Sequence, residues 1–329
     1  MLRVTRVLWV PAVVLALAVH CLAAAPKKVF TDPADAGPDF ALQGEYVGTV
    51  ATDLGDMKVG VQVIALGDGK FRAVGCMGGL PGEGWDQTEV PSAEGQLKDG
   101  AVVFNDVESG NAAATLKDGQ LIVKQEDKVI ATLKKVERKS PTLGQKPPEG
   151  AVVLFDGTSA DKFEKGRMTK DGLLMEGADS KQKFQSFRGH LEFRLPFQPY
   201  DRGQGRGNSG FYAQGRYEVQ ILDSFGLEGK DNECGGIYQI AKPRVNLCFP
   251  PLSWQTYDVD YTAAEFKDGK KVNSARITVR HNGVLIHENV ELPHATVASI
   301  VKEGPEPGPI HLQNHGNPVR FRNIWVVEK

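Results

Sequence analysis

Tight-turn dipeptides recur along most of this chain and constrain its fold more than any other feature. They are found at Asp68-Gly69, Asp99-Gly100, Asp118-Gly119, Asp171-Gly172, Asp268-Gly269 and Asn282-Gly283. Such pairs favour two-residue β-hairpin turns, because both turn positions need a positive φ angle. The runs beside them alternate apolar and polar residues, as in Val59–Leu66 and Lys70–Val74. Since no convincing amphipathic helix interrupts this pattern, the sequence predicts an all-β protein.

A proline-rich segment divides the expected strands into two groups. Residues 40–136 predict a small all-β domain of unknown role, and residues 137–150 predict an extended, semi-rigid linker. Residues 151–329 carry evenly spaced strands and turns, which are typical of a jelly-roll sandwich. The strands of this second domain are expected at Leu191–Leu195, Gly210–Ala213, Tyr217–Leu222, Thr256–Tyr261, Ala275–His281, Val284–His287 and Arg320–Val327.

Residues 1–25 have the pattern of a secretory signal peptide. Arg3 and Arg6 precede an apolar run, Val7–Val19, which is too short for a good membrane span. An uncleaved anchor and a lipoprotein modified at Cys21 are the alternatives. Cleavage would leave a flexible leader, residues 26–39, on a periplasmic or secreted protein without a transmembrane segment. The net charge of −2 gives no electrostatic case for binding nucleic acid or an anionic membrane.

Three cysteines remain after the expected cleavage. Cys234 and Cys248 would close a short loop and are the expected disulfide, which leaves Cys76 unpaired. The chain has no Cys-x-x-Cys spacing, so we do not expect these thiols to bind a metal.

A glycine-rich loop in the first domain, Gly78–Gly84, is followed by Trp85. Glycine-rich loops can cradle phosphate when they open a helix, but no helical pattern follows this one. The loop is therefore interpreted either as plain structure or as a ligand or partner contact made through Trp85.

One strand of the second domain carries the residues best suited to chemistry. In the run Arg216–Asp223, Tyr217, Val219 and Ile221 share one face, and Glu218 and Gln220 share the other. Carboxylates on a sandwich face serve general acid or base catalysis on sugars. The spacing Glu-x-Gln-x-x-Asp is similar to the Glu-x-Asp-x-x-Glu signature of laminarinase-like glucanases, with an amide in place of the middle acid. A solvated strand face that ends in a turn aspartate is the alternative.

A second polar run lies near the C-terminus. His311, Gln313 and His315 share one strand face. Two histidines at positions i and i+4 of a strand lie roughly 13 Å apart, so they cannot ligate one metal directly. Arg322 could bind a hydroxyl or carboxylate, or could face solvent. Tyr212 and Tyr238 are aromatic candidates for stacking on a sugar ring, although such residues more often pack in a core.

These stretches together resemble the 3-keto-disaccharide hydrolase family over residues 151–329. The stretches that carry the resemblance are Leu154–Gly157, His190–Arg194, Asn208–Tyr212, Arg216–Asp223, Cys234–Tyr238, Trp254–Asp258 and His315–Trp325. The resemblance implies a concanavalin A-like, glucanase-type jelly roll. It also implies action on glycosides whose C3 hydroxyl has been oxidised to a ketone, by a separate sugar 3-oxidoreductase.

The implied chemistry suits the missing nucleophilic carboxylate. A C3 ketone acidifies the C2 proton, so a base can remove it and expel the C1 substituent, after which water adds. We expect catalytic roles for Glu218, His315 and Asp223. We expect substrate binding by the residues Asn208, Tyr212, Gln220, Tyr238, Gln313 and Arg322. No cofactor is required, although sandwiches of this type often bind calcium or another divalent metal. A non-catalytic carbohydrate-binding module and a structural surface protein are the alternatives.

Overall fold

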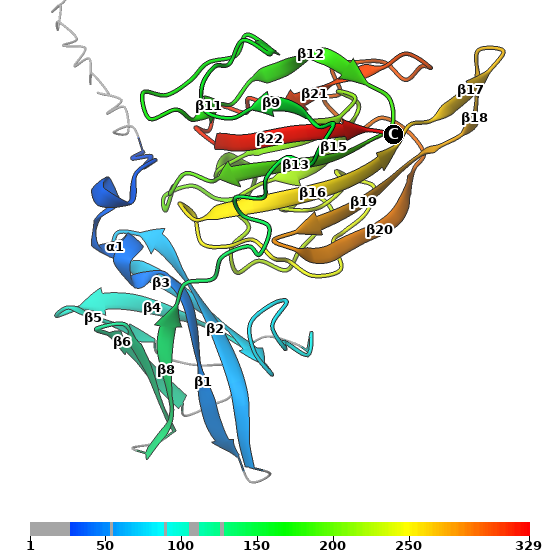
Figure 1. The fold of residues 1–329 in the computed structure, drawn as a ribbon. Helices are drawn as coiled ribbons and strands as arrows, with labels where there is room; N and C mark the ends of the chain where they lie inside the picture. Colours follow the sequence, from blue (N-terminus) through cyan, green and yellow to red (C-terminus); the bar gives the residue numbers. More distant parts are fainter. Residues whose placement is uncertain (1–26, 53–54, 89–90, 105–111, 126–127) are drawn as a thin grey trace, which may run out of the picture.

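The computed structural model describes residues 27–52, 55–88, 91–104, 112–125 and 128–329 (Figure 1). The predicted signal peptide lies outside these residues. In the described part of the chain, no helix is both long and apolar enough to span a membrane.

The first unit is a closed antiparallel barrel of eight strands (Figure 1). Its strands are β1 (Gly44–Thr52), β2 (Gly55–Gly67), β3 (Lys70–Met77), β4 (Ser92–Lys98), β5 (Ala101–Phe104), β6 (Ala112–Lys117), β7 (Gln120–Gln125) and β8 (Lys128–Val136). The barrel closes because β1 pairs with both β2 and β8. The predicted hairpin turns are present: at Asp99-Gly100 both φ angles are positive, 49° and 78°.

The segment expected to be a flexible leader is folded onto the protein from residue 27 onward. It forms a 3₁₀ turn, Pro33–Asp35, and the short helix α1 (Gly37–Leu42). Phe30 and Phe40 place their rings 5.8 and 5.4 Å from the ring of Phe197, which is fully buried. These aromatic contacts explain why the leader is ordered.

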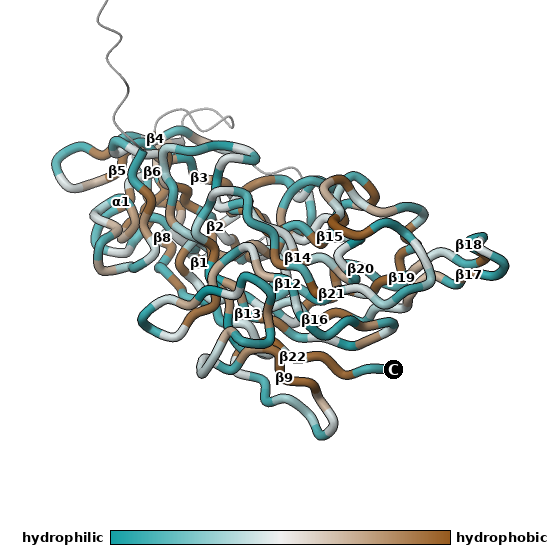
Figure 2. The backbone as a smooth tube through the Cα atoms, turned by 90° about the horizontal axis from the view of Figure 1, so that it is seen from above, coloured by the Kyte–Doolittle hydropathy of each residue, from teal (hydrophilic) through white to brown (hydrophobic). Residues whose placement is uncertain are grey.

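The second unit is a sandwich of two antiparallel sheets, as the sequence predicted. The five-stranded sheet has the order β10 (Phe163–Glu164), β12 (Ala178–Phe184), β21 (Gly308–Leu312), β14 (Ser209–Ala213), β15 (Tyr217–Ile221). The seven-stranded sheet has the order β11 (Leu174–Met175), β22 (Arg320–Glu328), β13 (Phe187–Arg194), β16 (Trp254–Thr262), β19 (Ala275–His281), β20 (Val284–Leu292), with β9 (Val152–Phe155) also paired to β22. A separate hairpin, β17 (Glu265–Lys267) and β18 (Lys270–Asn273), projects from the sandwich and is mostly hydrophilic (Figures 1 and 2). The apolar faces of the two sheets bury one continuous core between them.

A buried ion pair fastens the barrel to the sandwich. Arg138, two residues after β8, donates two hydrogen bonds to the carboxylate of Glu45 at 2.7 and 2.5 Å. The same guanidinium donates to the carbonyl of Pro81 and lies 4.9 Å from the ring centre of Phe249, in the sandwich. The side chain of Glu45 is 1% exposed, so removing its partner would leave a buried charge.

We predict that Arg138→Ala lowers the free energy of unfolding by about 3–5 kcal/mol, because the charge of Glu45 then stays buried with no cation beside it and only the hydrogen bond from Gln62 remains. Arg244→Ala is the matched control, since Arg244 and Glu288 form a 2.7 Å pair in which both side chains are more than half exposed. The control should cost less than about 1 kcal/mol. Urea denaturation of both variants checks the difference, and equal losses would show that the Glu45 pair does not hold the junction.

Candidate active site

Strand register brings the predicted catalytic strand beside the C-terminal polar run. Tyr212 of β14 pairs with Glu218 of β15 on one side and with His311 of β21 on the other. Val219 and the other odd-numbered residues of β15 point into the core. The alternate residues therefore point away from the core, and the face of the five-stranded sheet that they form carries Glu218, Gln220, Tyr212 and His311.

Glu218 is the most perturbed carboxyl group on this face. It is 3% exposed, and burial raises its pKa from 4.5 to about 7, although a hydrogen bond with Tyr212 lowers that pKa in part. Gly210 leaves the space that the carboxylate occupies: a Cβ atom at residue 210 would lie 2.3 Å from Glu218 Oε1. A carboxyl group with a pKa near neutrality can exchange a proton at physiological pH, as general acid–base catalysis requires.

Tyr212 connects Glu218 to a histidine–aspartate pair. Gln313 Nε2 donates to the Tyr212 hydroxyl at 3.1 Å. The ring of Tyr212 meets the ring of His311 edge to face, with their centres 4.9 Å apart. The Nδ1 atom of His311 lies 2.5 Å from Asp179 Oδ1, which fixes the orientation of the imidazole. Burial raises the pKa of Tyr212 far above its ordinary value, so this phenol keeps its proton.

A cluster of amides continues the face toward the start of β14. Gln204 accepts hydrogen bonds from Asn208 at 3.1 Å and from Gln220 at 3.2 Å. The carbonyl oxygens of the Asn208 and Gln220 side chains are buried, and neither has a partner among the described residues. Two buried acceptors without donors are rare in native structures and are typical of a site that a ligand or water completes.

The other predicted site residues lie in different surroundings. Tyr238 is half-buried, and its backbone N–H donates to the carbonyl of Glu218 at 3.2 Å. His315 is exposed in the loop after β21. Asp223 is buried and ion-paired with Arg206 at 2.6 Å, so its carboxylate holds the loop before β14 to the end of β15.

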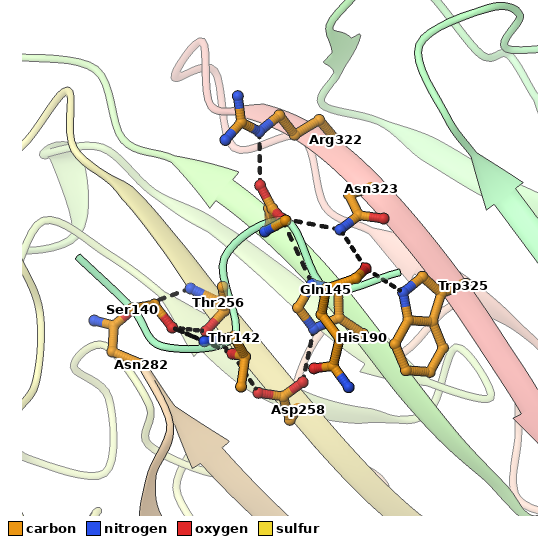
Figure 3. Close-up of polar contacts among 12 residues, drawn as sticks. Ser140, Thr142, Gln145, His190, Thr256, Asp258, Asn282, Arg322, Asn323 and Trp325 are labelled. Atoms are coloured by element: carbon orange, nitrogen blue, oxygen red, sulfur yellow. Dashed lines mark hydrogen bonds and ion pairs between the residues drawn. The ribbon is translucent and has the colours of Figure 1, made fainter. Parts of the chain in front are cut away.

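The structure places Arg322 on β22 of the seven-stranded sheet (Figure 3), whereas Glu218 belongs to the five-stranded sheet. Arg322 Nε donates to Glu192 at 2.6 Å, and the guanidinium lies 3.9 Å from the ring centre of Trp254. The expected linker covers this region: Thr142 donates to Asp258 at 2.8 Å, and the Gly144 N–H donates to Glu192 at 2.6 Å. The segment is therefore packed onto the sheet rather than extended between domains.

Cys234 and Cys248 are buried free thiols in the structure, and the expected disulfide is not formed. The sulfur of Cys234 lies 3.3 Å from the Tyr257 hydroxyl, and that of Cys248 lies 3.5 Å from the carbonyl of Leu222. Within the described residues, no group of three or more His, Cys, Asp or Glu side chains could hold a metal ion.

Sequence reasoning missed two residues of this face, Asp179 and Gln204. Asp179 is 132 residues from its partner His311, and only the pairing of β12 with β21 brings the two together. Gln204 sits in the loop before β14, in the short 3₁₀ turn Gly203–Gly205, and no local pattern distinguishes it as a site residue.

The second unit is similar to known proteins. Residues 150–327 match the family described as the 3-keto-alpha-glucoside-1,2-lyase-like domain. A crystal structure of a candidate glycosyl hydrolase from Parabacteroides distasonis ATCC 8503 is similar over 55% of this chain and 85% of its own, with 35% sequence identity and a TM-score of 0.50. A second candidate glycosyl hydrolase from that organism has 18% identity and a TM-score of 0.41, over 55% of this chain and 94% of its own. No curated protein matches this chain.

Fold, site and comparisons define a carbohydrate-active β-sandwich protein with an additional N-terminal barrel. The chain belongs to the 3-keto-alpha-glucoside-1,2-lyase-like domain family, as its resemblance to the 3-keto-disaccharide hydrolases predicted.

We predict that Glu218→Gln makes the protein more stable at alkaline pH. The folded-state pKa of about 7 lies above the ordinary 4.5, so the folded state holds this proton between those pH values and loses stability as the pH rises through them. The difference corresponds to about 3 kcal/mol above pH 7. Urea denaturation should show the variant to be more stable at pH 8, with the gain vanishing near pH 4. A gain that does not depend on pH would contradict a raised pKa at Glu218.

Proposed function

We propose that this protein is an exported enzyme that cleaves 3-keto-glycosides, including 3-keto-disaccharides, by elimination followed by hydration. The observation that carries the proposal is the buried carboxyl of Glu218, whose pKa is raised to about 7 beside amide, phenol and imidazole groups. A binding module needs no acid of this kind. Family membership supports the keto-sugar as the substrate class.

In the proposed reaction, the carboxylate of Glu218 removes the proton at C2. The electron pair left on C2 forms a double bond to C1 or is held as the enolate of the C3 ketone, and the C1–O bond to the aglycone breaks. The aglycone oxygen takes a proton as it leaves, and water then adds across the double bond. Because the ketone supplies the electron sink, the reaction needs no carboxylate nucleophile.

Glu218 is assigned as the base because of its hydrogen bond with Tyr212. The raised pKa of Tyr212 keeps its hydroxyl protonated. The hydroxyl donates to the carbonyl of Val297 at 3.3 Å, and when it turns to the carboxylate of Glu218 it favours the ionised form that a base requires. Gln220 and Gln313 present amide groups that can donate to the enolate oxygen or to substrate hydroxyls. The His311–Asp179 pair is a candidate for protonating the leaving oxygen.

Two further parts of the proposal lie outside the site. The C3 hydroxyl of the sugar must be oxidised to a ketone beforehand, and we assign that oxidation to a separate sugar 3-oxidoreductase. Export to the periplasm or beyond rests on the pattern of residues 1–25, and N-terminal sequencing of the mature protein from fractionated cells tests it.

The purified protein should release sugar from a 3-keto-disaccharide but not from its unoxidised parent. The parent lacks the ketone that acidifies the C2 proton, so the base cannot remove this proton and elimination does not occur. Glu218→Gln should lower kcat by at least about 10²-fold, the usual contribution of a general base. Chromatographic measurement of released sugar checks both points, and equal cleavage of the parent would refute the proposal.

The rate should fall as the pH drops through about 7, because protonation of Glu218 removes the base. A pH profile of kcat/KM tests this sign. If the rate instead falls as the pH rises through this range, Glu218 acts as the acid.

Gly210→Ala should lower activity, since its Cβ would lie 2.3 Å from Glu218 Oε1 and 2.8 Å from Tyr212 Cε2 and would displace both the carboxylate and the phenol ring. Gly304→Ala is the matched control, because a Cβ there meets nothing within 4 Å. Comparable activity in the two variants would show that the position of Glu218 does not matter.

A further inference from the structure

A cavity of about 660 Å³ lies between the barrel and the sandwich, and none of the residues assigned to the proposed reaction lines it. Arg72 and Trp85 line it from the barrel, and Lys230, Glu233 and Asn246 line it from the sandwich. Cavities that bind small molecules usually measure about 300–1,000 Å³. The cavity is therefore large enough to hold one or two sugar rings.

Two hydrogen-bond donors of the cavity-lining residues have no acceptor. The Nε atom of Arg72 and the Nε1 atom of Trp85 are shielded from solvent and lack a partner among the described residues. Arg72 uses its Nη2 atom to donate to the carbonyl of Gly226 at 3.0 Å, but none of the ion pairs formed by the described residues includes it. Donors left without acceptors in this way cost free energy, which a ligand oxygen would recover once a small turn of either side chain exposes its donor to the cavity.

The glycine-rich loop holds Trp85 in a fixed position at this cavity. A Cβ atom at Gly78 or Gly79 would lie 2.3 Å from a backbone carbonyl oxygen across the loop, so only glycine permits the close approach. The backbone N–H of Trp85 donates to the carbonyl of Leu80, and the carbonyl of Pro81 accepts a hydrogen bond from Arg138. The loop is thus closed on itself and tied to the buried ion pair, and it presents a half-buried indole to the cavity.

The charges around the cavity favour an uncharged ligand. Arg72 and Lys230 are balanced by Glu228 and Glu233, all four of which line it. Glu233 accepts hydrogen bonds from two backbone N–H groups, and Glu228 lies 3.4 Å from Lys230. A phosphate or a carboxylate would meet these two acids. A sugar ring suits the cavity better, because its hydroxyl groups both donate and accept and its apolar face can stack on an indole.

We propose that this cavity is a second carbohydrate site, which binds an uncharged saccharide through Trp85 and Arg72 and is separate from the Glu218 face. It gives the barrel a role: a glycan held here stays attached to the same molecule as the catalytic sandwich, which raises its effective concentration.

Binding of cellotriose and maltotriose to the full-length protein, measured by isothermal titration calorimetry, tests this proposal. The Glu218→Gln protein serves as the parent, so that the readout does not depend on turnover. At least one of the two trisaccharides should bind. Trp85→Ala should weaken that binding at least tenfold, and Arg72→Met should do the same while leaving the loop intact. Arg276→Met is the matched control, since Arg276 is exposed on β19 and does not line the cavity.

Three results would overturn the second site: no binding of either trisaccharide at millimolar concentration, binding that Trp85→Ala and Arg72→Met leave unchanged, or tighter Trp85-dependent binding of inorganic phosphate or digalacturonate. The Trp85→Ala change in the otherwise unaltered protein should leave cleavage of a 3-keto-disaccharide intact. Failure of the second site and failure of the proposed reaction are thereby distinguished.

Discussion

Desolvation of one carboxyl group, that of Glu218, governs what the polar face of the five-stranded sheet can do. The alternation of β15 requires Glu218 to point away from the core, yet neighbouring groups leave it only 3% exposed. Gly210 provides the space for the carboxylate, and Tyr212 supplies a hydrogen bond that offsets part of the cost of burial. A folded protein that keeps such a group ionised gives up stability, which is common where a site is built for reactivity.

A second buried charge, the Glu45–Arg138 pair, sets how the barrel meets the sandwich. Arg138 contacts β1 through Glu45, the glycine-rich loop through Pro81 and the sandwich through Phe249. Because one guanidinium serves all three contacts, the position of the Trp85 loop depends on the same pair that joins the two units. The junction therefore positions the Trp85 loop as well as joining the two units. Residues of the barrel and of the sandwich together line the cavity beside this loop.

Local patterns predicted the fold well, and they failed where distant strands decide the contacts. The Asp-Gly turns and the alternation of β15 are properties of a few neighbouring residues, so both could be read from the sequence. Arg322 was assigned to the substrate site, but β22 pairs with β13 and belongs to the other sheet. The expected leader and linker were interpreted from their prolines. Both segments are instead held against the protein by contacts, the leader with Phe197 and the linker with Glu192, and no local sequence pattern predicts these contacts.

The two sheets show how surroundings, rather than residue type, separate a structural carboxylate from a reactive one. Glu192 and Glu218 each lie on a strand and are almost fully buried. Burial alone would raise the pKa of Glu192. Hydrogen bonds from Asn323, the Gly144 N–H and Arg322, together with the His190 imidazole 3.7 Å away, outweigh burial and lower that pKa to about 2. Glu218 has only the partial compensation of Tyr212, and its pKa rises to about 7. The linker thus completes a permanent ion-pair network on the seven-stranded sheet. On the five-stranded sheet, the cost of burying the Glu218 carboxylate is only partly offset, which leaves a carboxyl group suited to proton transfer.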